Sequence, residues 1–127
     1  MANPNIVAVT AIVGNSLSVA VGTSATQLAS NAASSGKVYK INSIVVANID
    51  GTSAADITVN VYSAASLGGT PIAIVSTVSV PADASLIVTD KTTTFYLLEN
   101  QSIGAIAGTA SDLVATASWE EITAPPP

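Results

Sequence analysis

The clearest structural signal in this chain is Asp56-Ile57-Thr58-Val59-Asn60-Val61-Tyr62, in which apolar and polar side chains alternate. Successive side chains of an extended strand point to opposite faces, so Ile57, Val59 and Val61 share one face and the polar residues between them share the other. This period of two predicts a strand with one buried face and one solvated face.

A longer strand is predicted immediately before it. Residues 38–47 become apolar on both faces at their centre, as expected of a middle strand that is covered twice or bent by a bulge. The intervening Asp50-Gly51 pair supplies the positive φ that tight hairpin loops require. We therefore predict that residues 38–62 form one hairpin.

Other apolar or alternating segments follow at the close spacing typical of sandwiches and barrels. Trp119 is predicted to be the largest single block of the core, and the glycine- and alanine-rich segment 103–108 is expected to be a strand that another layer approaches closely. The predicted strands of this part cover residues 71–80, 86–88, 95–98, 103–108 and 112–122.

The first third of the chain gives a weaker pattern. Residues 6–13 and 17–21 are predicted as two strands that meet at Gly14-Asn15. Residues 24–35 are small, polar and turn-rich, and a helical turn over 26–29 stays open as an alternative.

These segments predict an all-β fold, a single antiparallel β-sandwich of eight to ten short strands with jelly-roll or immunoglobulin-like topology. A chain of 127 residues suits one core, so we expect residues 1–124 to form one domain and residues 125–127 a proline tail. The N-terminus lacks the basic residues of a signal peptide and an apolar run of spanning length, so neither a signal peptide nor a membrane segment is expected.

The composition favours a structural protein over an enzyme. Charged residues make up 9% of the chain, far below the roughly 25% of an ordinary soluble domain. A surface of hydroxyl and methyl groups loses little solvation when another protein covers it, which suits a permanent assembly.

Residue types that carry most chemistry are missing from the sequence, which contains no Arg, His or Cys. We expect no catalytic residues, no metal site and no cofactor. The net charge of −5 disfavours nucleic acid as a partner.

Two acidic patterns have an ordinary explanation. Asp50 and Asp56 lie six residues apart with hydroxyls between them, as in a calcium loop, but an EF-hand needs more oxygen ligands and a closing Glu, so a simple turn is favoured. Glu120 and Glu121 are neighbours on one strand and therefore point to opposite faces, so they cannot act together as a carboxylate pair.

The remaining candidates are lysines and aromatic residues. A Ser-Lys dyad through Lys37, Lys40 or Lys91 is formally open, although strand lysines more often protect an edge or meet an acidic neighbour. The aromatic residues Tyr39, Tyr62, Tyr96 and Trp119 would form a sugar-stacking platform if they shared one exposed face, but a core position for Trp119 is favoured.

One long motif carries a resemblance to a known family. It comprises Ser34-Ser35-Gly36-Lys37-Val38-Tyr39-Lys40-Ile41-Asn42-Ser43-Ile44-Val45-Val46-Ala47-Asn48-Ile49-Asp50-Gly51, followed by segments 55–59 and 78–83, and the opening 1–16 and closing 111–122 fit the same pattern. The chain thus resembles, over nearly its whole length, small virion structural proteins of tailed bacteriophages that infect marine bacteria, especially cyanobacteria. The segment 63–70 and the triple-proline tail depart from the common pattern.

The resemblance implies a role in particle assembly. We expect a capsid decoration or cement protein on the outer capsid surface, made in the host cytoplasm, that contacts the major capsid protein or other virion proteins as a homo-oligomer, with a trimer favoured. Alternatives are a neck, tail or fibre-associated component and a carbohydrate- or receptor-binding module. Lys37 and Lys40 are the candidate partner contacts, facing an acidic partner surface, and neither nucleic acid nor a membrane is expected as a partner.

Overall fold

The computed structural model describes residues 4–125, which form nine strands and one short 3-10 turn. Met1–Asn3, Pro126 and Pro127 lie outside the described residues, so most of the expected proline tail does too. In chain order the elements are η1 (Ile6–Ala8), β1 (Ala11–Val21), β2 (Thr26–Asn31), β3 (Lys37–Asn48), β4 (Ala55–Ala64), β5 (Gly68–Val80), β6 (Ser85–Thr89), β7 (Phe95–Leu97), β8 (Gln101–Ala107) and β9 (Leu113–Thr123).

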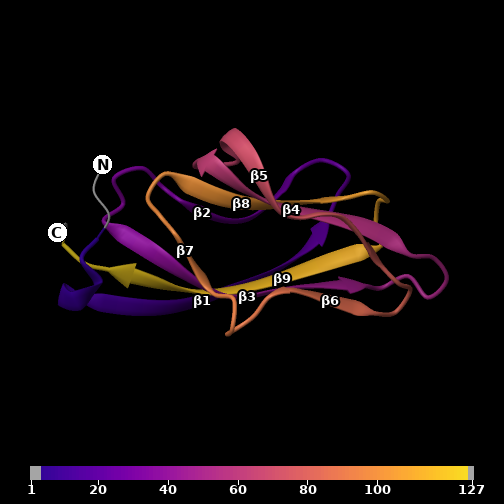
Figure 1. The fold of residues 1–127 in the computed structure, drawn as a ribbon, viewed down its shortest axis with the longest axis horizontal. Helices are drawn as coiled ribbons and strands as arrows, with labels where there is room; N and C mark the ends of the chain where they lie inside the picture. The colour runs from indigo at the N-terminus through magenta and orange to yellow at the C-terminus, as the bar shows by residue number, and fades with distance from the viewer. Residues whose placement is uncertain (1–3, 126–127) are drawn as a thin grey trace.

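The strands form two antiparallel sheets that pack face to face, as the two layers of Figure 1 show. One sheet, here called sheet A, has the order β1-β9-β3-β6, with β7 also paired to β3. The other, sheet B, has the order β2-β8-β4-β5. The predicted antiparallel β-sandwich is therefore confirmed.

The strand order identifies the sandwich as a jelly roll. Strands β1 to β4 alternate between sheets A and B, and the chain returns through β8 and β9 to insert one strand into each sheet beside the earlier ones. This interleaving is the double Greek key of a jelly roll. In an immunoglobulin-like sandwich the first two strands share one sheet, whereas here they lie in different sheets.

The core lies between the sheets and is built from the alternating faces seen in the sequence. In β4, Ile57 and Val59 are fully buried while Thr58 is half-buried, and in β9 the residues Leu113, Ala115, Ala117 and Trp119 face inward. Isoleucine and valine fill a pleated surface well, because branching at Cβ restricts their rotamers in strands. The predicted inner face of β9 is confirmed, with Trp119 in the core cluster, and that of β4 is confirmed at Ile57 and Val59. In β4, however, Val61 is only half-buried, and Asn60, expected on the solvated face, is buried.

Gly104 of β8 is closely approached, as expected, but by the β4–β5 turn and the neighbouring strands of sheet B and not by the other sheet. A Cβ at this position would lie 2.7 Å from Cδ2 of Leu67, 3.0 Å from Cε1 of Tyr62 and 3.3 Å from the backbone oxygen of Thr26. Leu67 belongs to the β4–β5 turn, which folds over sheet B and is held by a hydrogen bond from its amide to Oγ of Ser102 (2.8 Å). A side chain at position 104 would displace this turn.

The prediction that residues 38–62 form one hairpin is wrong. β3 belongs to sheet A and β4 to sheet B, so the Asp50-Gly51 segment crosses between the sheets. Asn48 fixes this crossing, because its buried side-chain amide donates to the backbone oxygens of Ser53 (2.9 Å) and Val80 (3.0 Å). An Asp-Gly turn reverses the chain equally well within one sheet, as a hairpin, or between two sheets. The strand with which β3 or β4 pairs is instead decided by contacts between residues that are distant in sequence.

The N-terminal predictions also need correction. Residues 6–8 form a 3-10 turn and residues 11–21 form one uninterrupted strand, so Gly14-Asn15 is no turn. The segment expected to be turn-rich, 24–35, contains β2, and the helical turn over 26–29 is absent from it. Continuous pairing of β1 with β9 extends the backbone through Gly14, which overrides its low strand propensity.

The described ends of the chain lie side by side, since the Asn5 amide donates to the backbone oxygen of Pro125 (2.8 Å). Across residues 4–125, no helix has the length and apolar character needed to cross a membrane.

Candidate functional site

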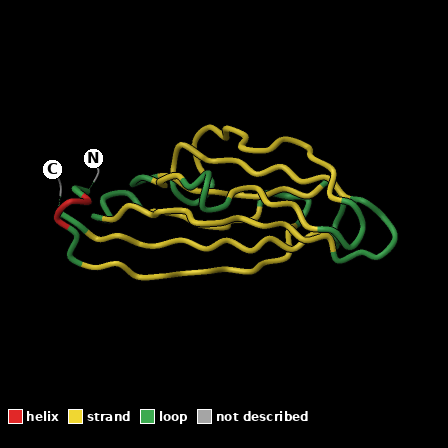
Figure 2. The backbone as a smooth tube through the Cα atoms, turned by 60° about the horizontal axis from the view of Figure 1, so that its bottom comes forward, coloured by secondary structure: helices red, strands yellow, loops and turns green. Residues whose placement is uncertain are grey.

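The free edge of β1 is a long, exposed and apolar feature of the fold. β1 pairs with β9 in one continuous register, from Ala11 opposite Thr123 to Val21 opposite Leu113. Within residues 4–125 no strand pairs with its other edge, and Figure 2 shows β1 as the outermost long strand leading away from the red helical turn. The backbone groups along this edge are therefore open to another chain.

Apolar side chains of β1 are exposed on both faces of the sheet. Ile12 is 56% exposed on the outer face, and Val13 and Leu17 are 53% and 37% exposed on the face that looks toward sheet B. Sheet B ends on this side with the short strand β2, so only Val21, at the far end of β1, is buried. Because β1 extends beyond the edge of sheet B, its exposed Ile, Val and Leu side chains lie uncovered beside a free backbone edge.

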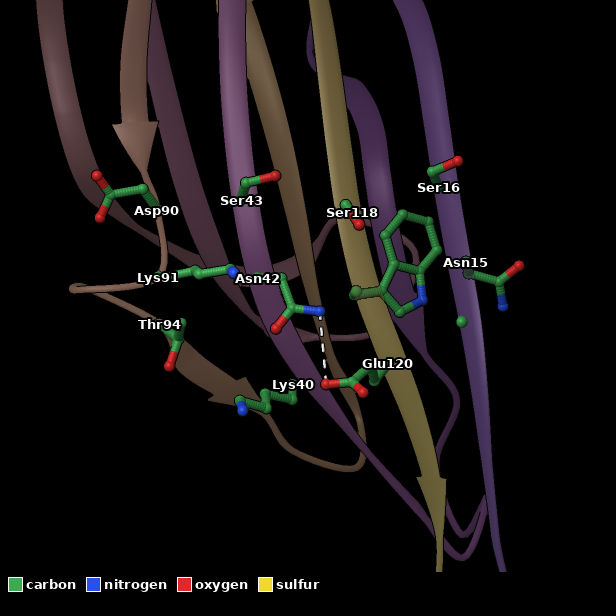
Figure 3. A pocket seen from close by; sticks show the side chains of 12 residues that line it. Asn15, Ser16, Lys40, Asn42, Ser43, Asp90, Lys91, Thr94, Ser118 and Glu120 are labelled. Carbon is green, nitrogen blue, oxygen red and sulfur yellow. Dashed lines mark hydrogen bonds between the residues drawn. The ribbon is translucent and has the colours of Figure 1, made fainter.

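The outer face of sheet A is hollowed and polar. The concave surface encloses about 1140 Å³ and crosses β1, β9, β3 and the loop after β6, as Figure 3 shows. Asn42 donates from Nδ2 to Oε1 of Glu120 across it, at 3.5 Å. Its lining residues are Gly14, Asn15, Ser16, Lys40, Asn42, Ser43, Asp90, Lys91, Thr94, Ser118, Trp119 and Glu120.

The structure separates the two lysines predicted as partner contacts. Lys40 lines the concave face, together with Lys91. Lys37 is three residues away on β3 and forms an ion pair with Glu121 of its own chain, with Nζ 3.2 Å from Oε1. Whether either lysine contacts a partner stays a prediction, but the geometry leaves Lys40 as the one beside the larger open surface.

Glu121 organises a polar and aromatic cluster that the sequence did not reveal. Its carboxylate, 15% exposed, accepts hydrogen bonds from Asn15 Nδ2 and Trp119 Nε1 (3.3 Å), in addition to the lysine. The rings of Trp119 and Tyr39 stack with centroids 6.2 Å apart and an interplanar angle of 15°. Side-chain alternation along β9 was the sequence signal that could have indicated this cluster. It places Glu121 on the same face as Trp119 and Glu120 on the opposite face, as expected.

Both burial and neighbouring charges shift the pKa of the Tyr39 phenol. Burial raises the pKa of Tyr39 above its ordinary value of 10.0, the Glu121 carboxylate raises it further, and Lys37 lowers it in part. A raised pKa in the folded state means that Tyr39 contributes stability that is complete below pH ~10 and is lost as the pH rises through the folded value.

We expect Glu121→Gln to lower the pKa of Tyr39, because the substitution removes the neighbouring negative charge. The measurement is the ultraviolet titration of a chain carrying Tyr62→Phe and Tyr96→Phe, in which Tyr39 is the remaining tyrosine. Glu120→Gln is the matched control and should leave the titration unchanged, since Glu120 points to the opposite face. Equal shifts in both variants would contradict the assigned geometry.

The structure bears on two alternatives, a calcium loop at Asp50 and Asp56 and a sugar-stacking platform of aromatic residues. Asp50 accepts hydrogen bonds from the amide (3.0 Å) and Oγ1 (2.7 Å) of Thr52, which lower the pKa of its carboxyl, and no cluster of three or more metal-ligating side chains occurs within residues 4–125. Trp119 is buried, which confirms its predicted core position, and Tyr39 and Tyr62 are buried as well, while Tyr96 is 46% exposed. One exposed platform of all four aromatic residues is therefore wrong.

Comparison with known proteins supports the fold and little else. The chain matches no protein-family model, and no curated protein sequence matches it. One similar solved structure is titled "Bacillus endospore appendages form a novel family of disulfide-linked pili", with a TM-score of 0.51 and 16% identity over 89% of this chain and 88% of that chain. The present chain has no cysteine. At this level of identity the likeness extends to the sandwich fold alone.

Proposed function

We propose that this chain is a non-enzymatic structural component of a bacteriophage particle, a decoration or cement protein on the outer capsid surface. The observation that carries the proposal is the exposed β1 edge, which offers backbone pairing and apolar side chains but no charged residue. A free edge of this kind is a ready template for another chain, and soluble monomers usually protect it.

The charge distribution suits the outside of a shell. The chain has a net charge of −5 and its three basic residues are all lysines, so a genome-facing position would bring it against a polyanion with little to attract it. One lysine, Lys37, is already engaged by Glu121. Lys40 is then our candidate contact with an acidic patch of the major capsid protein or another virion protein.

The sequence resemblance and the fold both agree with assembly. The segment 34–51 that carries the resemblance to virion structural proteins contains β3, the strand between β9 and β6 in sheet A. Jelly rolls are common in viral capsid and lectin domains, although a fold by itself does not define a function. One solved structure with a similar fold is titled as disulfide-linked pili, which are also assembled structures.

The copy number in purified particles tests this proposal. We expect hundreds of copies of the chain per particle by quantitative mass spectrometry, because a decoration protein occupies repeated lattice positions of the shell. Tens of copies or fewer would instead indicate a neck, tail or fibre-associated component. Absence from particles would overturn the proposal altogether.

The concave face of sheet A favours a second candidate, a carbohydrate- or receptor-binding module. Its lining of hydroxyl, amide and charged groups is able to hydrogen-bond a polyhydroxylated ligand. Against it, the buried Trp119 and Tyr39 do not present ring faces for stacking. Saturable binding to a glycan array by the purified chain, lost in a Lys40→Ala variant that keeps its fold, would favour this candidate over assembly alone.

A further inference from the structure

The four sheet edges of this sandwich are protected to very different degrees. β2 has 6 residues and a register shift, β5 contains Pro71 and several register shifts, and β6 and β7 have 5 and 3 residues. Shortness, proline and bulges are the devices by which proteins prevent strands from pairing at an edge. β1 has none of them, since its 11 residues include no proline and no charge and pair with β9 in continuous register.

We propose that β1 pairs antiparallel with β1 of a second copy of this chain, across a two-fold axis at Ser16. The inference deepens the proposed function, and rests on it, by naming the partner of the β1 edge. Sheet A of one copy would then join sheet A of the other into one continuous sheet, with the two β1 strands at its centre. A two-fold pair replaces, in this proposal, the threefold cluster that the sequence favoured.

Charge is the first argument for a second copy as the occupant. Two identical chains with a net charge of −5 repel one another, so they can meet closely only where each surface is uncharged. All 11 residues of β1 are uncharged. Of the two nearest acids on β9, Glu121 forms an ion pair with Lys37, whereas Glu120 keeps its charge and accepts a hydrogen bond from the neutral Asn42 on the outer face of sheet A.

Register is the second argument, because β1 is self-complementary. When the whole strand overlaps with its copy, Ser16 lies opposite Ser16, and Val13 of each copy lies opposite Val19 of the other. Asn15 then lies opposite Leu17. The exposed Val13 and Leu17 thus gain cross-strand neighbours on the face that sheet B leaves uncovered.

A single engineered cysteine tests the register, because the chain has no other thiol. Ser16→Cys should form a covalent dimer under mild oxidation, since residues opposite one another in an antiparallel pair have Cα atoms ~4.5–5.5 Å apart, within the range of a disulfide. Ser18→Cys is the control on the same face. Position 18 lies opposite Gly14 of the other copy, so the two introduced thiols would be separated by four positions, roughly 13 Å, and out of reach of each other. Equal yields, a higher yield for Ser18→Cys, or no dimer in either variant would overturn the proposal.

A non-covalent variant provides an independent measurement. Val13→Lys should raise the dimer dissociation constant, measured by analytical ultracentrifugation, by about tenfold or more, because pairing would desolvate a charged side chain opposite the apolar Val19 of the other copy. Ile72→Lys introduces the same change on β5, where Ile72 is 68% exposed, and should leave the dimer unchanged. A monomeric native chain, or a trimer insensitive to Val13→Lys, would contradict the pairing.

These experiments use the purified chain alone, so their outcome is separate from that of the particle analysis. A chain present in particles that fails to pair through β1 overturns only this inference. A chain that pairs through β1 but is absent from particles overturns only the proposed function.

Discussion

Trp119→Ala is expected to lower the free energy of unfolding by about 3–5 kcal/mol, the usual cost of removing a large buried aromatic side chain. Trp119 is 9% exposed, stacks on Tyr39 and donates from Nε1 to Glu121 at 3.3 Å. The alanine leaves a cavity beside Tyr39 and removes one donor from the Glu121 carboxylate. Urea denaturation followed by circular dichroism measures the loss without requiring the tryptophan signal.

Two further variants separate packing from the hydrogen bond. Trp119→Phe keeps an aromatic ring against Tyr39 and should lose less, roughly 1–2 kcal/mol. Tyr96→Ala removes an aromatic residue that is 46% exposed and should change stability by about 0.5 kcal/mol or less. A Trp119→Ala chain as stable as Tyr96→Ala would mean that Trp119 is no core residue and would revive the exposed sugar-stacking site.

Gly104→Val should destabilise the fold by about 3 kcal/mol, because overpacking forces neighbouring groups to move. A Cβ at position 104 meets Leu67 at 2.7 Å, Tyr62 at 3.0 Å and the backbone of Thr26 at 3.3 Å. The leucine side chain is able to turn away, but the tyrosine is buried and the β2 backbone is hydrogen-bonded to β8. The midpoint and slope of urea denaturation, compared with the native chain, measure the effect.

Gly14→Val is the matched control on β1. No atom lies within 4 Å of a Cβ built on Gly14, and valine favours the extended backbone of a strand. This variant should therefore be neutral or slightly more stable than the native chain. If both glycine variants lost equal stability, the cost would come from the loss of glycine itself and not from the close approach at β8.

The strands with strict alternation were predictable where one face is buried and the other is not, which holds in β4 at Ile57 and Val59 but fails at Val61, which is half-buried, and at Asn60, which is buried. Ile57 and Val59 in β4, and Leu113 to Trp119 in β9, lie on the inner faces that their period of two indicates. A close approach at Gly104 was predictable for a related reason, since a strand made of glycine and alanine leaves room for a neighbouring segment, although the segment is the β4–β5 turn and not a second layer. In both cases the local sequence and the tertiary environment agree.

Other features depended on contacts that no local pattern contains. Residues 38–62 looked like a hairpin because Asp50-Gly51 is a good turn, yet β3 pairs with β9 and β4 with β8, strands that come much later in the chain. The cluster around Glu121 could not be predicted from the sequence for the same reason. Asn15, Lys37 and Glu121 meet only because β9 inserts between β1 and β3.

The sequence by itself determined that the protein is a β-sandwich with few reactive groups, because side-chain alternation and the absence of Arg, His and Cys are properties of the chain alone. Only the tertiary structure decided that the sandwich is a jelly roll, that β1 is a free and unprotected edge, and that Glu121 collects its three donors. The physical reason is that period and composition act on neighbouring residues, whereas sheet order and exposed edges follow from strand pairing between residues far apart in the chain.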